Sequence, residues 1–162
     1  MNPKTPALFL LLLSLTAFTA CDSGRVFDQY QKIGNSGWHK DSLVVFTIPV
    51  TDSLQNYHLQ IQIRHEKNYE YSNLWLFVEI TQPGGKMIRD TFELALAEPS
   101  GRWLGEGLGG ILTLQTNYKR NFWFPVAGEY SISIQQGMRK EVLTGIHDVG
   151  VRLEKSKISG KK

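Results

Sequence analysis

The stretch YHLQIQIR, residues 57–64, alternates between apolar and polar side chains at every step. Successive side chains of a β-strand point to opposite faces of its sheet. Strict alternation therefore predicts a strand with one face in a protein core and the other face in water. The core face would carry Tyr57, Leu59, Ile61 and Ile63, and the wet face would carry His58, Gln60, Gln62 and Arg64.

Six further segments have the composition of strands, because β-branched and aromatic residues dominate them and turn residues such as Gly and Pro separate them. No part of the chain shows a convincing helical period of apolar residues. The pattern predicts an all-β fold, a single β-sandwich of about seven or eight antiparallel strands, with either a jelly-roll or an immunoglobulin-like topology. The six segments are residues 43–50, 74–81, 87–97, 117–124, 129–135 and 146–154.

The N-terminus has the pattern of a secretory signal peptide. Lys4 precedes an apolar run over residues 7–18, and small residues stand immediately before Cys21. The run is shorter than the roughly 20 residues that a helix needs to cross a bilayer. Residues 18–21, Phe-Thr-Ala-Cys, resemble a lipobox, the site at which a lipoprotein signal peptidase cuts. We therefore expect residues 1–20 to be removed and Cys21 to become the N-terminus.

Cys21 is the only cysteine of the chain, so it has no partner for an intrachain disulfide. With an S-diacylglycerol and an N-acyl chain it would hold the protein on a membrane, since two or more buried chains make anchoring stable. A free or intermolecularly bonded thiol is the alternative. We expect the covalent lipid, and no other cofactor.

The chain without its signal peptide has the size of one domain. We expect a lipid-anchored tether over residues 21–37, the β-sandwich over 38–154 and a basic, disordered tail over 155–162. Fully extended, such a tether would reach roughly 55 Å and hold the domain clear of the bilayer. Alternatively, part of the tether docks on the sandwich as an edge strand. The small formal net charge of +3 argues against a nucleic-acid surface or a polybasic membrane patch.

Several patterns that carry chemistry in other proteins have a simpler structural explanation here. Gly105, Gly107 and Gly110 fit G-x-G-x-x-G, but no helix follows them, so we expect a turn and no nucleotide. The four histidines lack the spacing of a zinc site, and we expect them to face solvent. Asp41 and Asp148 could contribute to a calcium site, although the other ligands cannot be named. Because no catalytic set is evident, we expect no enzyme and no resident metal.

Aromatic residues provide the candidate binding surfaces. Trp75 and Phe77 lie opposite the apolar face of segment 74–81, and Trp123 stands in a similar aromatic run. If these side chains are exposed they mark a partner surface, whereas a covering loop would make them part of the core. Trp38 and Trp103 are candidates for stacking on sugar rings, with anchoring in the core as the alternative.

Tyr130 follows Pro125 and Gly128 with a spacing like that of the tyrosine corner in Greek-key sandwiches. In that arrangement the tyrosine hydroxyl hydrogen-bonds to a backbone group a few residues upstream. We expect Tyr130 to have this structural role.

Short motifs occur in a fixed order along the chain. They are Cys21-Asp22, Arg25-Val26-Phe27-Asp28, Tyr30, Trp38-His39-Lys40-Asp41-Ser42, Tyr69, Tyr71-Ser72-Asn73-Leu74, Pro99, Gly101, Trp103-Leu104-Gly105, Gly107, Phe124-Pro125, Gly128, Tyr130, Met138-Arg139, Gly145-Ile146, Asp148-Val149-Gly150-Val151-Arg152 and Glu154. As an ordered set they resemble the gliding motility lipoprotein GldH family over nearly the whole chain. The resemblance implies an envelope lipoprotein needed for gliding, in a machinery tied to type IX secretion, and it implies no catalytic residues.

The residues that follow Cys21 indicate on which side of the membrane the protein would lie. Ser23 and Gly24 stand where surface-exported lipoproteins of gliding bacteria often have an acidic stretch, which favours an outer-membrane protein facing the periplasm. We therefore expect a non-enzymatic adaptor or assembly subunit that binds other envelope proteins of the gliding machinery, and no nucleic acid or nucleotide. A lipid-anchored carbohydrate-binding module is the alternative.

Overall fold

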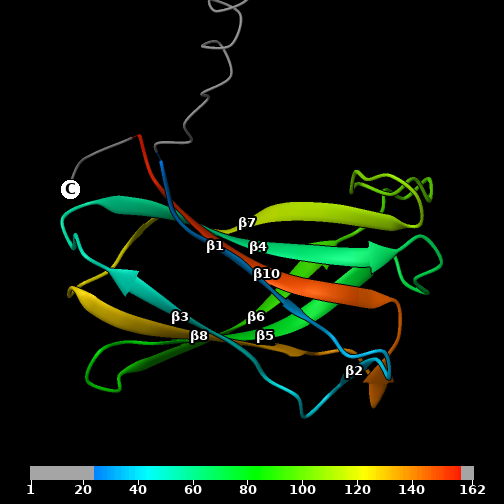
Figure 1. Ribbon diagram of the computed structural model, residues 1–162, viewed down its shortest axis with the longest axis horizontal. Helices are drawn as coiled ribbons and strands as arrows, with labels where there is room; N and C mark the ends of the chain where they lie inside the picture. Colours follow the sequence, from blue (N-terminus) through cyan, green and yellow to red (C-terminus); the bar gives the residue numbers. More distant parts are fainter. Residues whose placement is uncertain (1–23, 158–162) are drawn as a thin grey trace, which may run out of the picture.

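Two four-stranded antiparallel sheets packed face to face make up the computed structural model, which describes residues 24–157 (Figure 1). The first, the β4 sheet, has the order β1 (Arg25–Lys32), β10 (Ile146–Lys155), β4 (Asn56–Glu66) and β7 (Ile111–Trp123). The second, the β5 sheet, has the order β3 (Val44–Val50), β8 (Gly128–Gln136), β5 (Asn73–Thr81) and β6 (Met87–Ala95). A small pair at one end joins β2 (Trp38–His39) to β9 (Val142–Leu143).

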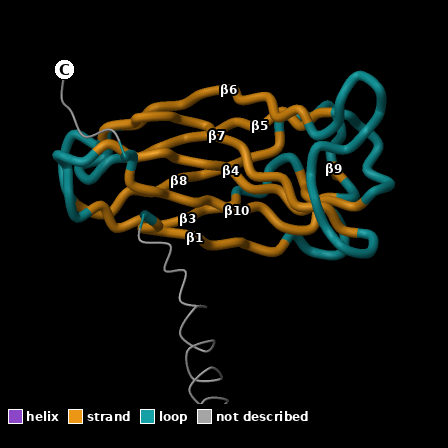
Figure 2. Tube along the Cα trace, turned by 90° about the horizontal axis from the view of Figure 1, so that it is seen from above, coloured by secondary structure: helices purple, strands orange, loops and turns teal. Residues whose placement is uncertain are grey.

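The strand pairing is that of a jelly roll. β5 and β6 form a hairpin, and around it the chain pairs β4 with β7, β3 with β8 and β1 with β10, in alternating sheets. This nesting of antiparallel pairs over eight strands is the double Greek key. The predicted β-sandwich is therefore confirmed, and the pairing decides between the two topologies that the sequence left open. Seen from above, the strands run along the length of the body with loops at both ends (Figure 2).

The inner face of β4 agrees with its alternation. Tyr57, Leu59, Ile61 and Ile63 are each at most 1% exposed, and they belong to one core cluster with the inner side chains of the β5 sheet. Burying a large apolar side chain contributes roughly 1.5 to 3 kcal/mol, so these positions hold the two layers together.

The outer face of β4 is not the wet face that was predicted. Gln60 and Gln62 are 8% and 3% exposed because their side chains bond with amides of β7. The Gln62 Nε2 donates to Gln115 Oε1 at 3.0 Å, and the Gln115 Nε2 donates to Gln60 Oε1 at 2.8 Å. Gly150 on β10 admits the Tyr30 ring beside them, since a Cβ at Gly150 would lie 2.8 Å from that ring. Polar residues can thus be buried on an outer face when neighbouring strands supply their partners.

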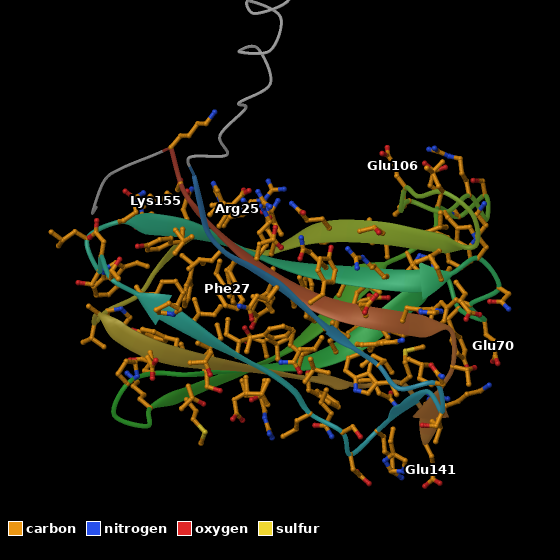
Figure 3. The ribbon with its side chains drawn as sticks, in the orientation of Figure 1. Arg25, Phe27, Glu70, Glu106, Glu141 and Lys155 are labelled. Carbon is orange, nitrogen blue, oxygen red and sulfur yellow. The ribbon has the colours of Figure 1, made fainter. Side chains whose placement is uncertain are left out.

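Most of the segment that was predicted to be a tether is a strand. Residues 25–32 form β1, the edge strand of the β4 sheet, which is the alternative that the sequence left open. Phe27 of β1 points between the layers and meets Phe46 of β3 edge to face, with ring centroids 6.4 Å apart (Figure 3). The predicted boundary at residue 38 is therefore wrong. The residues of β1 cannot also serve as an extended tether, so the predicted tether length of roughly 55 Å does not apply.

The C-terminal boundary also moves. β10 continues to Lys155, and Ser156 is 5% exposed with its backbone N–H donating to the Asn56 carbonyl at 2.7 Å. The sandwich therefore includes residues that were assigned to the tail. The predicted signal peptide, Cys21 and residues 158–162 lie outside the described residues.

Side-chain contacts join the two sheets along both long edges. On one edge the Gln31 amide of β1 donates to the Val45 carbonyl of β3. On the other edge Asp90 of β6 accepts from the Tyr118 hydroxyl at 2.7 Å and from the Lys119 ammonium at 2.5 Å, both on β7. These bonds lower the pKa of the Asp90 carboxyl, with the Lys119 bond as the largest cause. The sandwich is thus closed by polar contacts at its sides and by apolar packing within.

Tyr130 has the position that its spacing predicts. Its side chain is 1% exposed, and its hydroxyl donates to the Val126 carbonyl at 2.9 Å. We expect Tyr130→Phe to lower the free energy of unfolding by about 1 kcal/mol, the typical net value of one hydrogen bond, in urea denaturation. Tyr71→Phe is the control, because the Tyr71 hydroxyl makes no hydrogen bond within the described residues, and it should change stability by less than about 0.5 kcal/mol. Equal stability of Tyr130→Phe and the wild type would contradict the role.

Candidate functional site

Two large aromatic side chains stand exposed on the outer face of β5. Leu74, Leu76, Val78 and Ile80 fill the core from this strand, so the residues between them must point outward. Trp75 and Phe77 are 39% and 41% exposed, although β5 is an inner strand with β8 on one side and β6 on the other. Within residues 24–157 these side chains are therefore exposed, and no loop of that part of the chain covers them.

Two further exposed apolar side chains lie on the far side of β8. Phe77 pairs with Gln135 of β8, and beyond this polar residue Val45 of β3 is 41% exposed and Leu43, just before β3, is 57% exposed. Leu43 and Phe77 line one shallow hollow together with Gln135. We call the set Leu43, Val45, Trp75 and Phe77 the β5 outer patch.

A wider hollow of about 470 Å³ opens beside Trp75. The Met138 sulfur accepts the backbone N–H of Trp75 at 3.3 Å, which holds the loop after β8 against the start of β5. Gly137 allows this approach, since a Cβ there would lie 3.3 Å from both the Trp75 carbonyl oxygen and the Phe77 ring. Its backbone N–H donates to the Trp75 carbonyl at 2.7 Å. The hollow is lined by Tyr71, Asn73, Trp75, Gly137, Met138 and Arg139.

Charged residues of both signs border the patch. Arg89 pairs with Glu79 at 3.2 Å, and the Asn73 amide donates to Glu93 at 2.7 Å. Arg139 forms no ion pair within the described residues. An apolar centre with a polar border is the usual anatomy of a protein–protein contact surface. The arrangement is suited to binding another protein.

Trp123 does not join this surface. It lies on β7 of the other sheet, and its register partner is Asn56, at the opposite end of the sandwich from Trp75. Its indole N–H donates to the Ser53 carbonyl at 2.6 Å, and 44% of the side chain is exposed. Grouping Trp123 with Trp75 and Phe77 in one partner surface was therefore wrong, because sequence patterns do not show which sheet a strand enters.

The two tryptophans considered for glycan stacking are packed inward. Trp38 is 1% exposed and donates its indole N–H to the Ser42 carbonyl at 3.0 Å, so it has no face for a sugar ring. Trp103 is half-buried, and its ring lies against the His65 imidazole with centroids 4.7 Å apart. Trp38 was therefore wrongly proposed, and Trp103 is largely used in packing. No observation favours a carbohydrate site at either residue.

The remaining candidates from the sequence have structural roles or stand apart. Gly107 lets the loop approach β7, because a Cβ there would lie 2.2 Å from the Ile111 carbonyl oxygen. Asp148 pairs with Arg64 at 3.7 Å, while Asp41 is exposed. Within residues 24–157, no three His, Cys, Asp or Glu side chains gather as a metal site would require.

One contact that the sequence did not reveal joins residues 81 positions apart. The His147 Nε2 lies 3.1 Å from the Glu66 carboxylate, beside a hollow of about 290 Å³ that is also lined by residues 33–35 and Gly37. The sequence gives no indication of this contact, because the two residues come together only when β4 pairs with β10.

The comparisons with known proteins identify the family. The family model described as GldH lipoprotein matches residues 25–153, the span of the sandwich. The chain belongs to the GldH lipoprotein family. A gliding motility lipoprotein GldH homolog of Christiangramia forsetii is 44% identical over 93% of this chain and 96% of that protein. The gliding motility lipoprotein GldH of Flavobacterium johnsoniae is 40% identical over 90% and 94%.

Among solved structures, the infectious bursal disease virus VP2 subviral particle aligns with 82% of this GldH-family chain and 30% of its own chain. The TM-score is 0.35 and the identity 10%, which is too low to support an argument. Residues 24–157 contain no helix that could cross a membrane. Family membership therefore places the chain among lipoproteins associated with gliding motility.

His65 in this GldH-family sandwich is fully buried, contrary to the prediction that the histidines face solvent. Its Nδ1 donates to the Glu66 carbonyl at 2.9 Å, while its Nε2 is buried without a partner. Burial is the main cause that lowers the pKa of the imidazole, and the bond to the Glu66 carbonyl opposes it. The folded protein therefore holds His65 neutral.

We expect this burial to make the protein less stable in mild acid. The unfolded chain binds a proton at His65 near pH 6.5, before the folded chain does, so stability is full above that pH and falls as the pH drops toward the folded-state value. The slope is at most about 1.4 kcal/mol per pH unit. Urea denaturation of the wild type and His65→Phe at pH 7.5 and 5.5 measures it, and the variant should lose less stability on acidification. The other three histidines are common to both proteins, so equal losses would refute the role of His65.

Proposed function

We propose that this chain is a non-enzymatic, lipid-anchored adaptor or assembly subunit of a gliding machinery, and that the β5 outer patch contacts another protein of the cell envelope. The observation that carries the proposal is an inner strand whose outward face presents a Trp and a Phe. A free apolar surface at the middle of a sheet exposes area to water that a partner can bury.

The family supports the connection with gliding. The two relatives are named as a gliding motility lipoprotein and its homolog, and they cover nearly the whole chain. The resemblance of the ordered motifs to this family adds a functional tie to the type IX secretion machinery. The proposal therefore places the partner among the envelope proteins of that machinery.

The sequence around Cys21 supports the location. An apolar run, a lipobox-like Phe18-Thr19-Ala20-Cys21 and a lone cysteine fit an S-diacylglycerol and N-acyl anchor. Ser23 and Gly24 in place of an acidic stretch favour an outer-membrane protein that faces the periplasm.

The composition of the patch fits a partner protein. Trp is among the residues that most often dominate binding energy at interfaces, especially near the centre of a contact. Trp75 lies beside the hollow with Met138 and Arg139, so a side chain of the partner could enter next to the indole. Leu43 and Val45 lie beyond the polar side chains of β8, so a partner that contacts all four residues of the patch would cover more than one strand.

The double variant Trp75→Ser/Phe77→Ser tests the patch in a gliding bacterium that lacks its own copy of the gene. We expect spreading on agar to be lost and recovery of crosslinked envelope partners to fall at least tenfold, since interface aromatics commonly contribute 2 kcal/mol or more each, roughly 30-fold in affinity. Met87→Ser is the matched control, because Met87 is 61% exposed on the same outer face near the opposite end of β6. It should spread normally.

Folding must be unchanged for the test to count. Both side chains are partly exposed, so the melting temperature and the cellular amount of the double variant should match those of the control. Normal spreading with unchanged partner recovery in the double variant would show that the patch is not the docking surface.

The lipid anchor has a separate test. We expect the wild type to incorporate a clickable fatty-acid analogue and to fractionate with membranes, whereas Cys21→Ala should incorporate none, because the thioether and the new amino terminus are both lost. Labelling of Cys21→Ala at the wild-type level would contradict the anchor.

A further inference from the structure

The start of β1 places the sandwich close to the membrane. Only Asp22, Ser23 and Gly24 separate Cys21 from Arg25, the first residue of β1. At 3.3 to 3.6 Å per residue, the chain from Cys21 to Arg25 reaches at most about 14 Å. If Cys21 carries lipid, as proposed above, one end of the sandwich must therefore lie within that distance of the bilayer.

Backbone contacts identify which parts of the fold share that end. The Lys155 N–H donates to the Gly24 carbonyl at 2.8 Å, and the Ser156 N–H donates to the Asn56 carbonyl at 2.7 Å. The Ser156 hydroxyl donates to the Asn121 side chain at 2.6 Å. The starts of β1 and β4 and the ends of β10 and β7 thus meet at what we call the anchor-proximal end. Figure 3 shows Arg25 and Lys155 there, with Glu70, Glu106 and Glu141 at the opposite end.

The end of β7 and the neighbouring loops carry three exposed apolar side chains at the anchor-proximal end. Leu54 in the loop before β4 is 69% exposed, and Val126 in the turn after β7 is 44% exposed. Trp123 is also 44% exposed, and its hydrogen bond to the Ser53 carbonyl holds it against the loop that carries Leu54. Trp is enriched at membrane–water interfaces, where its ring lies at the level of the headgroups.

Basic side chains surround these apolar groups. Arg120, Lys155 and Lys157 are exposed and form no ion pair within the described residues. Arg25 is exposed as well and lies 3.9 Å from Asp28. The acidic groups at this end are Asp52, which accepts the Leu54 N–H, Glu129, and the pair Asp28 and Glu154, which both bond with Arg152. Because Arg152 occupies Asp28 and Glu154, the exposed basic side chains without an ion pair outnumber Asp52 and Glu129, which suits anionic lipid headgroups.

We propose that the anchor-proximal end is a second membrane contact, in which Trp123, Leu54 and Val126 enter the headgroup region and the basic side chains lie against anionic lipid. The lipid at Cys21 and this surface then act together, because one tethers the chain and the other sets its orientation. The sandwich stands on its end, and the hollow beside Trp75 faces away from the bilayer. Trp123 thus belongs to the membrane surface and not to the partner surface.

The other surfaces of the sandwich fit this orientation. None of the exposed large apolar side chains lies on β1, β10 or β4, and the outer face of those strands carries paired charges such as Arg152 with Asp28 and Arg64 with Asp148. A sandwich lying flat on that face would bury ion pairs with little apolar gain. The exposed Leu108 is in the loop before β7, at the opposite end, and an eleven-residue strand such as β4 spans about 37 Å. Leu108 therefore cannot reach the bilayer in the upright orientation.

The test uses the full lipidated chain in vesicles that contain brominated phospholipids, which quench tryptophan fluorescence at short range. We expect quenching in the wild type and loss of at least about half of it in Trp123→Phe, because Trp123 alone among the four tryptophans would lie at the interface. Trp75→Phe is the matched control and should keep the quenching. Leu54→Asp should reduce the quenching of Trp123, because it places a charge in the proposed contact without changing the Trp123 side chain.

Vesicles of different lipid composition test whether the basic side chains contact anionic headgroups. Quenching should increase when anionic phosphatidylglycerol replaces part of the phosphatidylcholine, and the increase should vanish in Arg120→Glu/Lys155→Glu. No difference between the two kinds of vesicle would overturn the electrostatic part of the contact.

Flotation with the vesicles separates this inference from the anchor on which it rests. Flotation without quenching of Trp123 would overturn the membrane contact and leave the lipid anchor standing. Quenching that is lost in Trp75→Phe but kept in Trp123→Phe would overturn the orientation. Failure of the wild type to float would overturn the anchor and the contact together.

Discussion

Burial of alternate side chains between two sheets is the constraint on which the rest of this structure depends. The inner residues of β4 and β5 belong to one core cluster and are almost completely shielded from water. Because side chains alternate along a strand, burying Leu74, Leu76 and Val78 forces Trp75 and Phe77 outward. The exposed aromatic surface is thus a geometric consequence of the packing, and it persists because no other part of residues 24–157 covers it.

The pairing of the two chain ends gives the sandwich a direction. β1 pairs with β10 along the length of the β4 sheet, so the described chain starts beside the point where β10 ends. An N-terminal lipid anchor a few residues before β1 would place this end of the body at the membrane. The apolar and basic side chains near Trp123 and Lys155 lie there, while Trp75 lies at the other end and on the other sheet. The proposed adaptor role requires such a separation, because a surface that faces the bilayer cannot also receive a partner protein.

Several basic side chains cluster at one end of the sandwich although the net charge of the chain is small. A formal net charge of +3 gave no reason to expect a basic surface toward lipid. The fold gathers Arg25, Arg120 and Lys155 from three different strands at one end. Similarly, the buried Gln60 and Gln62 are polar residues whose partners come from β7, more than fifty positions away. Alternation of apolar and polar residues cannot reveal such partners, so it predicted that these two side chains face solvent.

The sequence by itself determined the fold class, most strand positions, the inner face of several strands and the role of Tyr130, because period two and turn residues are local properties. It also determined the family, through motifs distributed along the chain. Only the tertiary structure decided the jelly-roll pairing, the docking of β1 in place of a long tether and the separation of Trp123 from Trp75. It also decided the burial of Trp38 and His65. These features depend on which strands become neighbours, and that choice follows from contacts between residues far apart in the chain.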